Sequence, residues 1–167
     1  MTGFRFDLLR AQDPPLLHGW LLRPHVAQWW GPPDSIDALH ADLVADQGAP
    51  GATLAYIASI DGAPIGFIQS YTAMGSGDGW WEDVTDPGVR GIDQFLAHAD
   101  QLNQGMGRAM VRAFVQLLLA DPAVTLVQTD PRPDNARAIR CYTHAGFRPV
   151  GEVMTPDGPA LLMHCTR

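Results

Sequence analysis

The chain has 167 residues, of which 46% are hydrophobic, and a formal net charge of -7. This composition suffices for one domain with a buried core, and no segment has the charge-rich, apolar-poor composition of a disordered chain. The negative charge disfavours binding to nucleic acid, and no apolar run approaches the roughly 20 residues of a membrane span. We therefore expect a single domain over residues 1–167, located in the cytoplasm, with no nucleic-acid or membrane partner.

The first half of the chain predicts a strand, a group of helices and a β-hairpin. The Asp61-Gly62 pair between two apolar runs is a strong signal for the turn of such a hairpin. Pro24 and the Gly-Pro-Pro run at residues 31–33 interrupt the helical segment. The predicted elements are a strand at 4–9, helices within 13–46, a loop at 48–51, and strands at 53–60 and 63–74.

The second half predicts alternating strands and helices. Apolar residues recur at helical spacing from Met106 to Leu118, and Asp121-Pro122 ends that helix. A second helix begins at Pro133 with Asp134 as its N-cap and ends at Gly146, beyond which Phe147 supplies an apolar contact. The predicted strands are 89–97, 123–128, 148–154 and 160–165. We expect an α/β (α+β) fold with a mixed, mostly antiparallel sheet of six or seven strands, flanked by helices on both faces.

The loop Gln104-Gly105-Met106-Gly107-Arg108 opens the first of these two helices. Its glycines allow a ligand to approach the backbone, and the amides of a helix start attract phosphate groups. The sequence therefore predicts a cofactor that carries a pyrophosphate. Asn135 and Tyr142 are seven residues apart, so both should project from nearly one face of the second helix, beside the cofactor.

This order of elements and these residues resemble the GCN5-related N-acetyltransferase superfamily, in which acetyl-CoA binds the loop between the fourth strand and the third helix. Further segments are similar to the aminoglycoside 6′-N-acetyltransferases, which confer antibiotic resistance. The similarity is dense from about residue 54 onward. These segments are GSGDGWWE at 75–82, TDPGVRGIDQ at 85–94, QTDP at 128–131 and TPDGPA at 155–160.

The resemblance implies that acetyl-CoA is the cosubstrate and that the glycine loop holds its pyrophosphate. Leu102 departs from the family pattern, which has Arg or Gln at that position. Backbone amides supply most of such a site, so we expect binding to survive, with Gln101, Gln104 or Arg108 as alternative sources of the missing contact. The expected cofactor-binding residues are Asn103, Gln104, Gly105, Met106, Gly107, Arg108 and Asn135.

Acidic residues gather between residues 78 and 100, where Arg90 is the single opposing base. Trp80 and Trp81 lie among them, and Trp29 and Trp30 lie upstream. Aromatic faces beside carboxylates suit a polyhydroxylated ligand that carries several ammonium groups. The acidic residues are Asp78, Glu82, Asp83, Asp86, Asp93 and Asp100.

The resemblance further implies that four aspartates contact an aminoglycoside such as kanamycin or tobramycin. For Trp30, packing of a helix end on the core is an equally favoured interpretation. The expected substrate-binding residues are Trp30, Tyr71, Asp78, Trp81, Asp93, Asp130 and Asp157.

Acetyl transfer requires a neutral amine, a stabilised oxyanion and a proton for the departing thiolate. We assign the first task to Asp93, through proton acceptance or positioning, and the last to Tyr142, whose alternative role is that of a core aromatic residue. Backbone amides of Asp93 and Gln94 suit the oxyanion. Cys141 is a weaker nucleophile candidate, because no histidine is evidently placed to activate it.

Scattered histidines and two cysteines without metal-ligand spacing predict no metal, and we expect a monomer or weak homodimer. Two alternatives remain. One is an acetyltransferase acting on another small amine or on a peptide α-amine. The other is a non-catalytic protein that binds aminoglycosides.

Overall fold

The computed structural model describes residues 3–167, within which seven strands, five α-helices, a π-helix (η1) and a 3₁₀-helix (η2) are found. The strands are β1 Phe4–Leu8, β2 Leu54–Ile60, β3 Ala63–Thr72, β4 Val89–Leu96, β5 Leu126–Thr129, β6 Arg148–Thr155 and β7 Gly158–Cys165. The helices are α1 Pro14–Leu21, α2 Pro24–Trp30, α3 Ile36–His40, η1 Ala41–Ala45, η2 Ala99–Gln101, α4 Met106–Leu119 and α5 Ala136–Ala145.

The strands pair in the order β1-β2-β3-β4-β5-β7-β6. β1 pairs with β2, β5 with β7 and β6 with β7 in antiparallel fashion, whereas β4 and β5 are parallel. The predicted mixed, mostly antiparallel sheet is therefore confirmed, with seven strands. The chain divides into two compact units, Met1–Gln69 with Gln94–Leu102, and Ser70–Asp93 with Asn103–Arg167.

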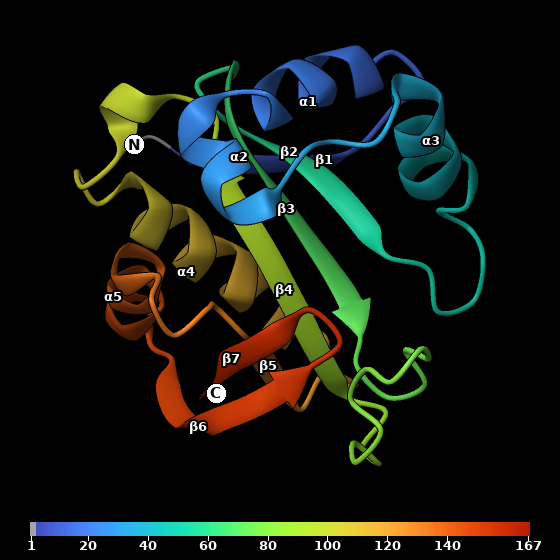
Figure 1. Cartoon of the computed structure of the whole chain (residues 1–167), viewed down its shortest axis with the longest axis vertical. Helices are drawn as coiled ribbons and strands as arrows, with labels where there is room; N and C mark the ends of the chain where they lie inside the picture. Colours follow the sequence, from blue (N-terminus) through green and yellow to red (C-terminus); the bar gives the residue numbers. More distant parts are fainter. Residues whose placement is uncertain (1–2) are drawn as a thin grey trace. The chain divides into compact units, whose positions relative to one another are not determined.

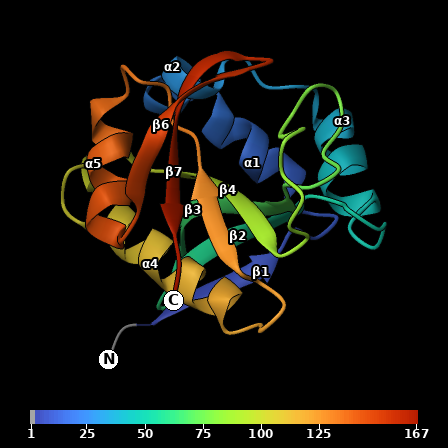
Figure 2. The ribbon, with the colours of Figure 1, turned by 90° about the horizontal axis from the view of Figure 1, so that it is seen from below.

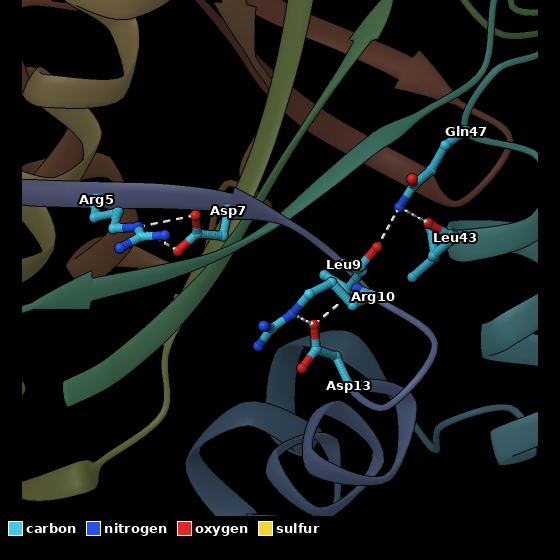
Figure 3. A network of polar contacts seen from close by, with 7 residues as sticks. All are labelled: Arg5, Asp7, Leu9, Arg10, Asp13, Leu43 and Gln47. Atoms are coloured by element: carbon cyan, nitrogen blue, oxygen red, sulfur yellow. Dashed lines mark hydrogen bonds and ion pairs between the residues drawn. The ribbon is translucent and has the colours of Figure 1, made fainter. Parts of the chain in front are cut away.

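The first unit, described from residue 3, has an aromatic and aliphatic core. Phe67 of β3 and Phe95 of β4 stack with ring centroids 5.4 Å apart, and Trp20 of α1 meets Phe95 edge-on at 6.3 Å. Polar contacts hold the end of β1 in place (Figure 3): the Asp13 carboxylate accepts the Arg10 amide at 2.7 Å, and Gln47 donates to the Leu9 carbonyl. The start of α1 is thereby fixed against β1.

The second unit contains the predicted strand and helix alternation of the second half of the chain. α4 and α5 lie side by side, as Figures 1 and 2 show from two directions, and β7 runs between β5 and β6. Figure 2 also shows the β6–β7 hairpin closing beside β5. Gly158 has a φ of +110° and begins β7 at the turn after Pro156 and Asp157.

Two local predictions are corrected and several are confirmed. The strand expected at 123–128 begins instead at Leu126, because Asp121 accepts the amides of residues 123 and 124 and extends the turn. Asp134 is not the N-cap of α5; Asn135 is, while Asp134 pairs with Arg132 at 3.1 Å.

The helix end at Gly146 is confirmed, with a φ of +112°. The Phe147 amide donates to the Tyr142 carbonyl, and the two rings meet with centroids 5.4 Å apart. This is the predicted apolar contact of a helix C-terminus. The Asp61-Gly62 turn is also confirmed: both residues have positive φ, as the favoured two-residue hairpin turn requires.

None of the helices in the described range 3–167 is long and apolar enough to span a bilayer. Within the same residues, no three His, Cys, Asp or Glu side chains are grouped so as to hold a metal ion.

Candidate active site

The N-terminus of α4 is arranged to receive an anion. Gly105 is its N-cap in the left-handed conformation, with a φ of +82°, and Asn103 before it also has a positive φ of +61°. No side chain caps this helix and its first turn contains no acidic residue. The first helical hydrogen bond runs from the Ala109 amide to the Gly105 carbonyl, which leaves the amides of residues 106–108 directed out of the helix start.

Arg108 adds a positive charge at this helix start. A β-carbon at Gly105 would lie 3.4 Å from Nη2 of Arg108, so the guanidinium folds back beside the loop. Helix amides, the helix dipole and a guanidinium together favour a phosphate group. The helix that follows is amphipathic, and its buried residues Met110, Val111 and Phe114 anchor the loop to the core.

α5 begins beside this region with a different kind of N-terminus. The side-chain oxygen of Asn135 accepts the Ala138 amide at 3.2 Å, so its Oδ1 caps the helix while its amide NH₂ group takes no part in the cap. Burial raises the pKa of the Cys141 thiol to about 11, with Arg108 acting weakly in the opposite direction. A raised pKa keeps the thiol protonated near neutral pH, which disfavours Cys141 as a nucleophile.

Tyr142 is almost fully buried, with 4% of its surface exposed, and its ring packs on Phe147. The ring therefore has the core role that we considered as its alternative. A role for the hydroxyl in catalysis requires only that its oxygen reach the ligand, and this role stays a prediction.

Parallel pairing brings two of the predicted aspartates together. Gly91 of β4 pairs with Gln128 of β5, and the Thr129 hydroxyl donates to the Ile92 carbonyl. Two residues beyond this pair, on the same face, lie Asp93 and Asp130. The sheet register thus sets the two carboxylates on neighbouring strands.

The pKa of Asp130 shows how close these groups are. Burial, and after it the negative charges of Asp93 and Asp157, together raise the pKa of the Asp130 carboxyl to about 8. Carboxylates that raise one another's pKa in this way would be stabilised by a nearby positive charge. A ligand with several ammonium groups would supply one.

Asp78 lies on a loop next to the turn that carries Asp157. Asp78 is exposed and has a left-handed backbone, with a φ of +54°. A β-carbon at its neighbour Gly79 would lie 3.5 Å from Pro156, so the two loops touch. The structure thus gathers the four predicted aspartates at one end of the second unit.

Tyr71 and Trp81 accompany these carboxylates. The Trp81 indole donates a hydrogen bond to the Tyr71 hydroxyl at 3.0 Å. The rings of Trp80 and Trp81 are neighbours, with centroids 5.9 Å apart. Burial raises the pKa of Tyr71, and the charges of Asp93 and Asp130 raise it further. Tyr71 is therefore a neutral hydroxyl beside the carboxylates at physiological pH.

Gly91 and Gln128 belong to this cluster, but they were not among the site residues predicted from the sequence. A β-carbon at Gly91 would lie 2.0 Å from Cζ of Tyr71, so only glycine leaves room for the ring. A glycine inside a predicted strand is a signal of such close approach, and it could have identified Gly91. Gln128, with 1% of its surface exposed, is a buried polar residue of β5.

The acidic residues between 78 and 100 do not share one role. The Asp86 carboxylate accepts the Thr125 hydroxyl at 2.6 Å and the Gly88 amide at 2.8 Å, and these bonds lower its pKa. Asp86 thus holds its own loop to the start of β5. Glu82 and Asp83 are exposed on the surface of the loop.

Trp30 lies in the first unit, at the end of α2. Its ring packs edge-on against Phe95 and Phe67, with ring centroids 5.3 Å and 5.8 Å apart. Of the surface of Trp30, 37% remains exposed. One side of the indole is thus a core contact, as one interpretation of the sequence predicted. The other side is accessible, and drug binding by Trp30 stays a prediction.

Known proteins are similar to this chain in sequence and in structure. The acetyltransferase (GNAT) domain family matches residues 10–155. Aminoglycoside N(6')-acetyltransferase type 1 of Klebsiella pneumoniae is 53% identical over 165 residues, covering 96% of this chain and 81% of that protein. The kanamycin resistance protein of Rhizobium radiobacter is 64% identical over 88 residues, covering 53% of this chain and 82% of that protein.

A solved structure carries the same fold. The crystal structure of aminoglycoside acetyltransferase AAC(6')-Ib with coenzyme A and kanamycin superimposes with a TM-score of 0.92 and 52% identity, covering 99% of this chain and 95% of that one. The family match spans most of the chain, and the identity extends over nearly its whole length. The chain belongs to the GNAT acetyltransferase family.

Proposed function

We propose that the protein transfers the acetyl group of acetyl-CoA to the 6′-amino group of aminoglycosides such as kanamycin and tobramycin, and thereby inactivates them. The whole chain acts as one acetyltransferase domain. The observation that carries the proposal is the cluster of aspartates around Asp130, whose charges raise its pKa and which lies at the end of β5, beside β4. The relatives named above act on, or were solved with, aminoglycosides.

The cofactor half of the site is the loop 103–108. Amides of residues 106–108 receive the pyrophosphate of acetyl-CoA, and Arg108 adds charge. Leu102, which stands where the family has a polar residue, donates its backbone amide to the Ala99 carbonyl and offers no polar side chain. Arg108 is the charged group best placed to compensate.

The substrate half is acidic and aromatic. Asp93 and Asp130 bind the ammonium groups nearest the reacting centre, while Asp78 and Asp157 bind groups at the rim. Trp81 and Tyr71 line the same region of the second unit. Carboxylates that repel one another gain most from a cationic ligand, because it removes the repulsion as well as adding attraction.

Catalysis then needs three contributions from this chain. Asp93 holds the 6′-ammonium and accepts its proton directly or through water, which frees the amine to attack the thioester carbon. Backbone amides of Asp93 and Gln94 are assigned to stabilise the oxyanion. The Tyr142 hydroxyl gives its proton to the departing thiolate.

Release of CoA with different amines tests this function. Kanamycin, a polyamine and a peptide with a free α-amine are offered separately at equal concentration, with acetyl-CoA in excess. We expect rapid CoA release with kanamycin alone. Release with the polyamine or peptide alone would assign a different acetyltransferase activity, and tight kanamycin binding without CoA release would indicate a sequestering protein.

A further inference from the structure

The loop between β3 and β4 carries Asp78 and Trp81 in a costly backbone conformation. Asp78 has a φ of +54° and Trp81 a φ of +53°. A positive φ is uncommon for any residue with a β-carbon, and for a bulky aromatic residue it persists only where the surrounding structure enforces it. A specific contact of the Trp81 side chain is therefore expected.

Side-chain hydrogen bonds fasten this loop at three places. Near its start the Ser76 hydroxyl donates to the last carbonyl of β3 at 3.1 Å, and near its end Asp86 accepts the hydroxyl that precedes β5 at 2.6 Å. Between them the Trp81 indole N–H donates to the Tyr71 hydroxyl at 3.0 Å. The exposed stretch with Asp78 lies between the first of these contacts and the Trp81 contact.

Two features hold the Tyr71 hydroxyl in one position. A β-carbon at Gly91 would lie 2.0 Å from Cζ of Tyr71 and 2.3 Å from the hydroxyl oxygen, so the ring end lies directly on the backbone of β4. Gly91 has no positive φ, so space and not backbone conformation explains the glycine. The second feature is a hydrogen bond between the side chains of Tyr71 and Gln128.

The direction of this second bond follows from the Gln128 amide. Its Nε2 has no partner, so the bond runs to Oε1, which accepts the Tyr71 proton. A chain of hydrogen bonds thus leads from the half-buried Trp81 through Tyr71 to Gln128, which is 1% exposed. Because its N–H is committed to Tyr71, the Trp81 indole offers a ligand its ring face and not a hydrogen bond.

We propose that Tyr71 is a positioning residue: its hydroxyl, held by Gln128, fixes the Trp81 indole and with it the loop that carries Asp78, and so sets the affinity for the aminoglycoside. The effect on drug affinity rests on the proposed function, whereas the anchoring of the loop does not. Tyr71 acts through Trp81 in this account, and the chemical step does not depend on it.

The anchor is tested first in the drug-free protein. Tyr71→Phe keeps the ring and removes the hydroxyl, and Tyr56→Phe on β2 is the matched control. Solvent exchange of the Trp81 indole proton is followed by two-dimensional NMR, with Trp81→Phe to assign the signal. We expect roughly 2- to 12-fold faster exchange in Tyr71→Phe, with no change in Tyr56→Phe or at Trp20 of the first unit. Unchanged exchange at Trp81 would overturn the proposal.

A double-mutant cycle tests whether Tyr71 acts through Trp81. In steady-state kinetics Tyr71→Phe should raise the KM for kanamycin roughly 3- to 10-fold, with kcat and the KM for acetyl-CoA within about twofold of wild type. In the Trp81→Phe background, where the anchored group is already lost, Tyr71→Phe should add less than about a twofold change. Effects that multiply in full would overturn the proposal, because Tyr71 would then act independently of the indole.

A third variant separates positioning from stability. Tyr71→Phe leaves the buried Gln128 amide without a partner and should lower the Tm, whereas Tyr71→Phe/Gln128→Leu removes both polar groups and should regain most of it. The KM for kanamycin should stay raised in this double variant. A KM that recovered together with the Tm would overturn the proposal. If wild type did not acetylate kanamycin while exchange at Trp81 quickened as expected, the proposed function would fail and the anchor would stand.

Discussion

Asp130→Asn should make the protein more stable at alkaline pH, although Asp130 belongs to the site. The unfolded chain ionises this carboxyl near its ordinary pKa of 3.8, whereas burial, Asp93 and Asp157 hold the folded pKa at about 8. Between these values the folded protein binds one more proton than the unfolded chain. The free energy of unfolding of the wild type therefore falls as pH rises from about 4 to about 8.

The size of this effect follows from the width of that window. At 1.36 kcal/mol for each pH unit, the free energy of unfolding of the wild type falls by at most about 5 to 6 kcal/mol by the time the pH exceeds 8. Even 2 kcal/mol would change the Tm of a chain of this length by about 4 to 8 °C. Asparagine carries no charge, so the variant should escape this loss while keeping nearly the same shape.

Thermal unfolding of the two proteins from pH 4 to pH 9 checks this reasoning. We expect nearly equal Tm values at pH 4 and a growing advantage of Asp130→Asn up to about pH 8. Asp134→Asn, which removes an exposed partner of Arg132, is the matched control and should leave the pH dependence unchanged. Parallel Tm curves for wild type and Asp130→Asn would refute the buried, repelled carboxyl. Kanamycin should raise the Tm of the wild type more than that of the variant, because it supplies the missing cation.

Three further predictions concern the proposed roles. Gly107→Val should abolish acetyl-CoA binding, measured by calorimetry, while the fold is kept. The control Gly48→Val, on a loop with open space around the glycine, should bind acetyl-CoA normally. Equal affinities of the two variants would remove the assignment of loop 103–108 to the cofactor. Tyr142→Phe should lower kcat by about 10² to 10⁴-fold in single-turnover experiments with both substrates still bound, and a near wild-type rate would leave Tyr142 as a core residue only. Asp93→Asn should nearly abolish transfer and spare acetyl-CoA binding, whereas Asp157→Asn on the exposed turn should raise the KM at most about fivefold; comparable losses in steady-state kinetics with kanamycin and tobramycin would contradict this ranking.

Much of the fold could be predicted because local patterns and tertiary structure agree. The helical spacing from Met106 onward, the Asp61-Gly62 turn and the helix-ending Gly146 all depend on short-range physics that a sequence displays directly. The errors occurred at boundaries. Asn135 and not Asp134 is the N-cap of α5, because the Asn135 side chain accepts the Ala138 amide, whereas Asp134 pairs with Arg132.

The site was less accessible to sequence reasoning, since its key geometry depends on pairing between distant strands. That Asp93 neighbours Asp130 follows from the register Gly91 to Gln128, which no local pattern specifies. The different roles of the acidic residues could not be predicted from local patterns either. The Asp86 carboxylate holds its loop by accepting the hydroxyl of Thr125, which is 39 residues away in the sequence. The family resemblance supplied the aspartates, but not the contacts among them.

The site of acetylation on the drug tests the central claim most directly. Kanamycin and acetyl-CoA are incubated with the protein, and the product is analysed by mass spectrometry and two-dimensional NMR. We predict a single added acetyl group on the 6′-nitrogen, with no product from an analogue that carries a hydroxyl group at that position. Acetylation of a different nitrogen, or no acetylated kanamycin at all, would contradict the proposed function.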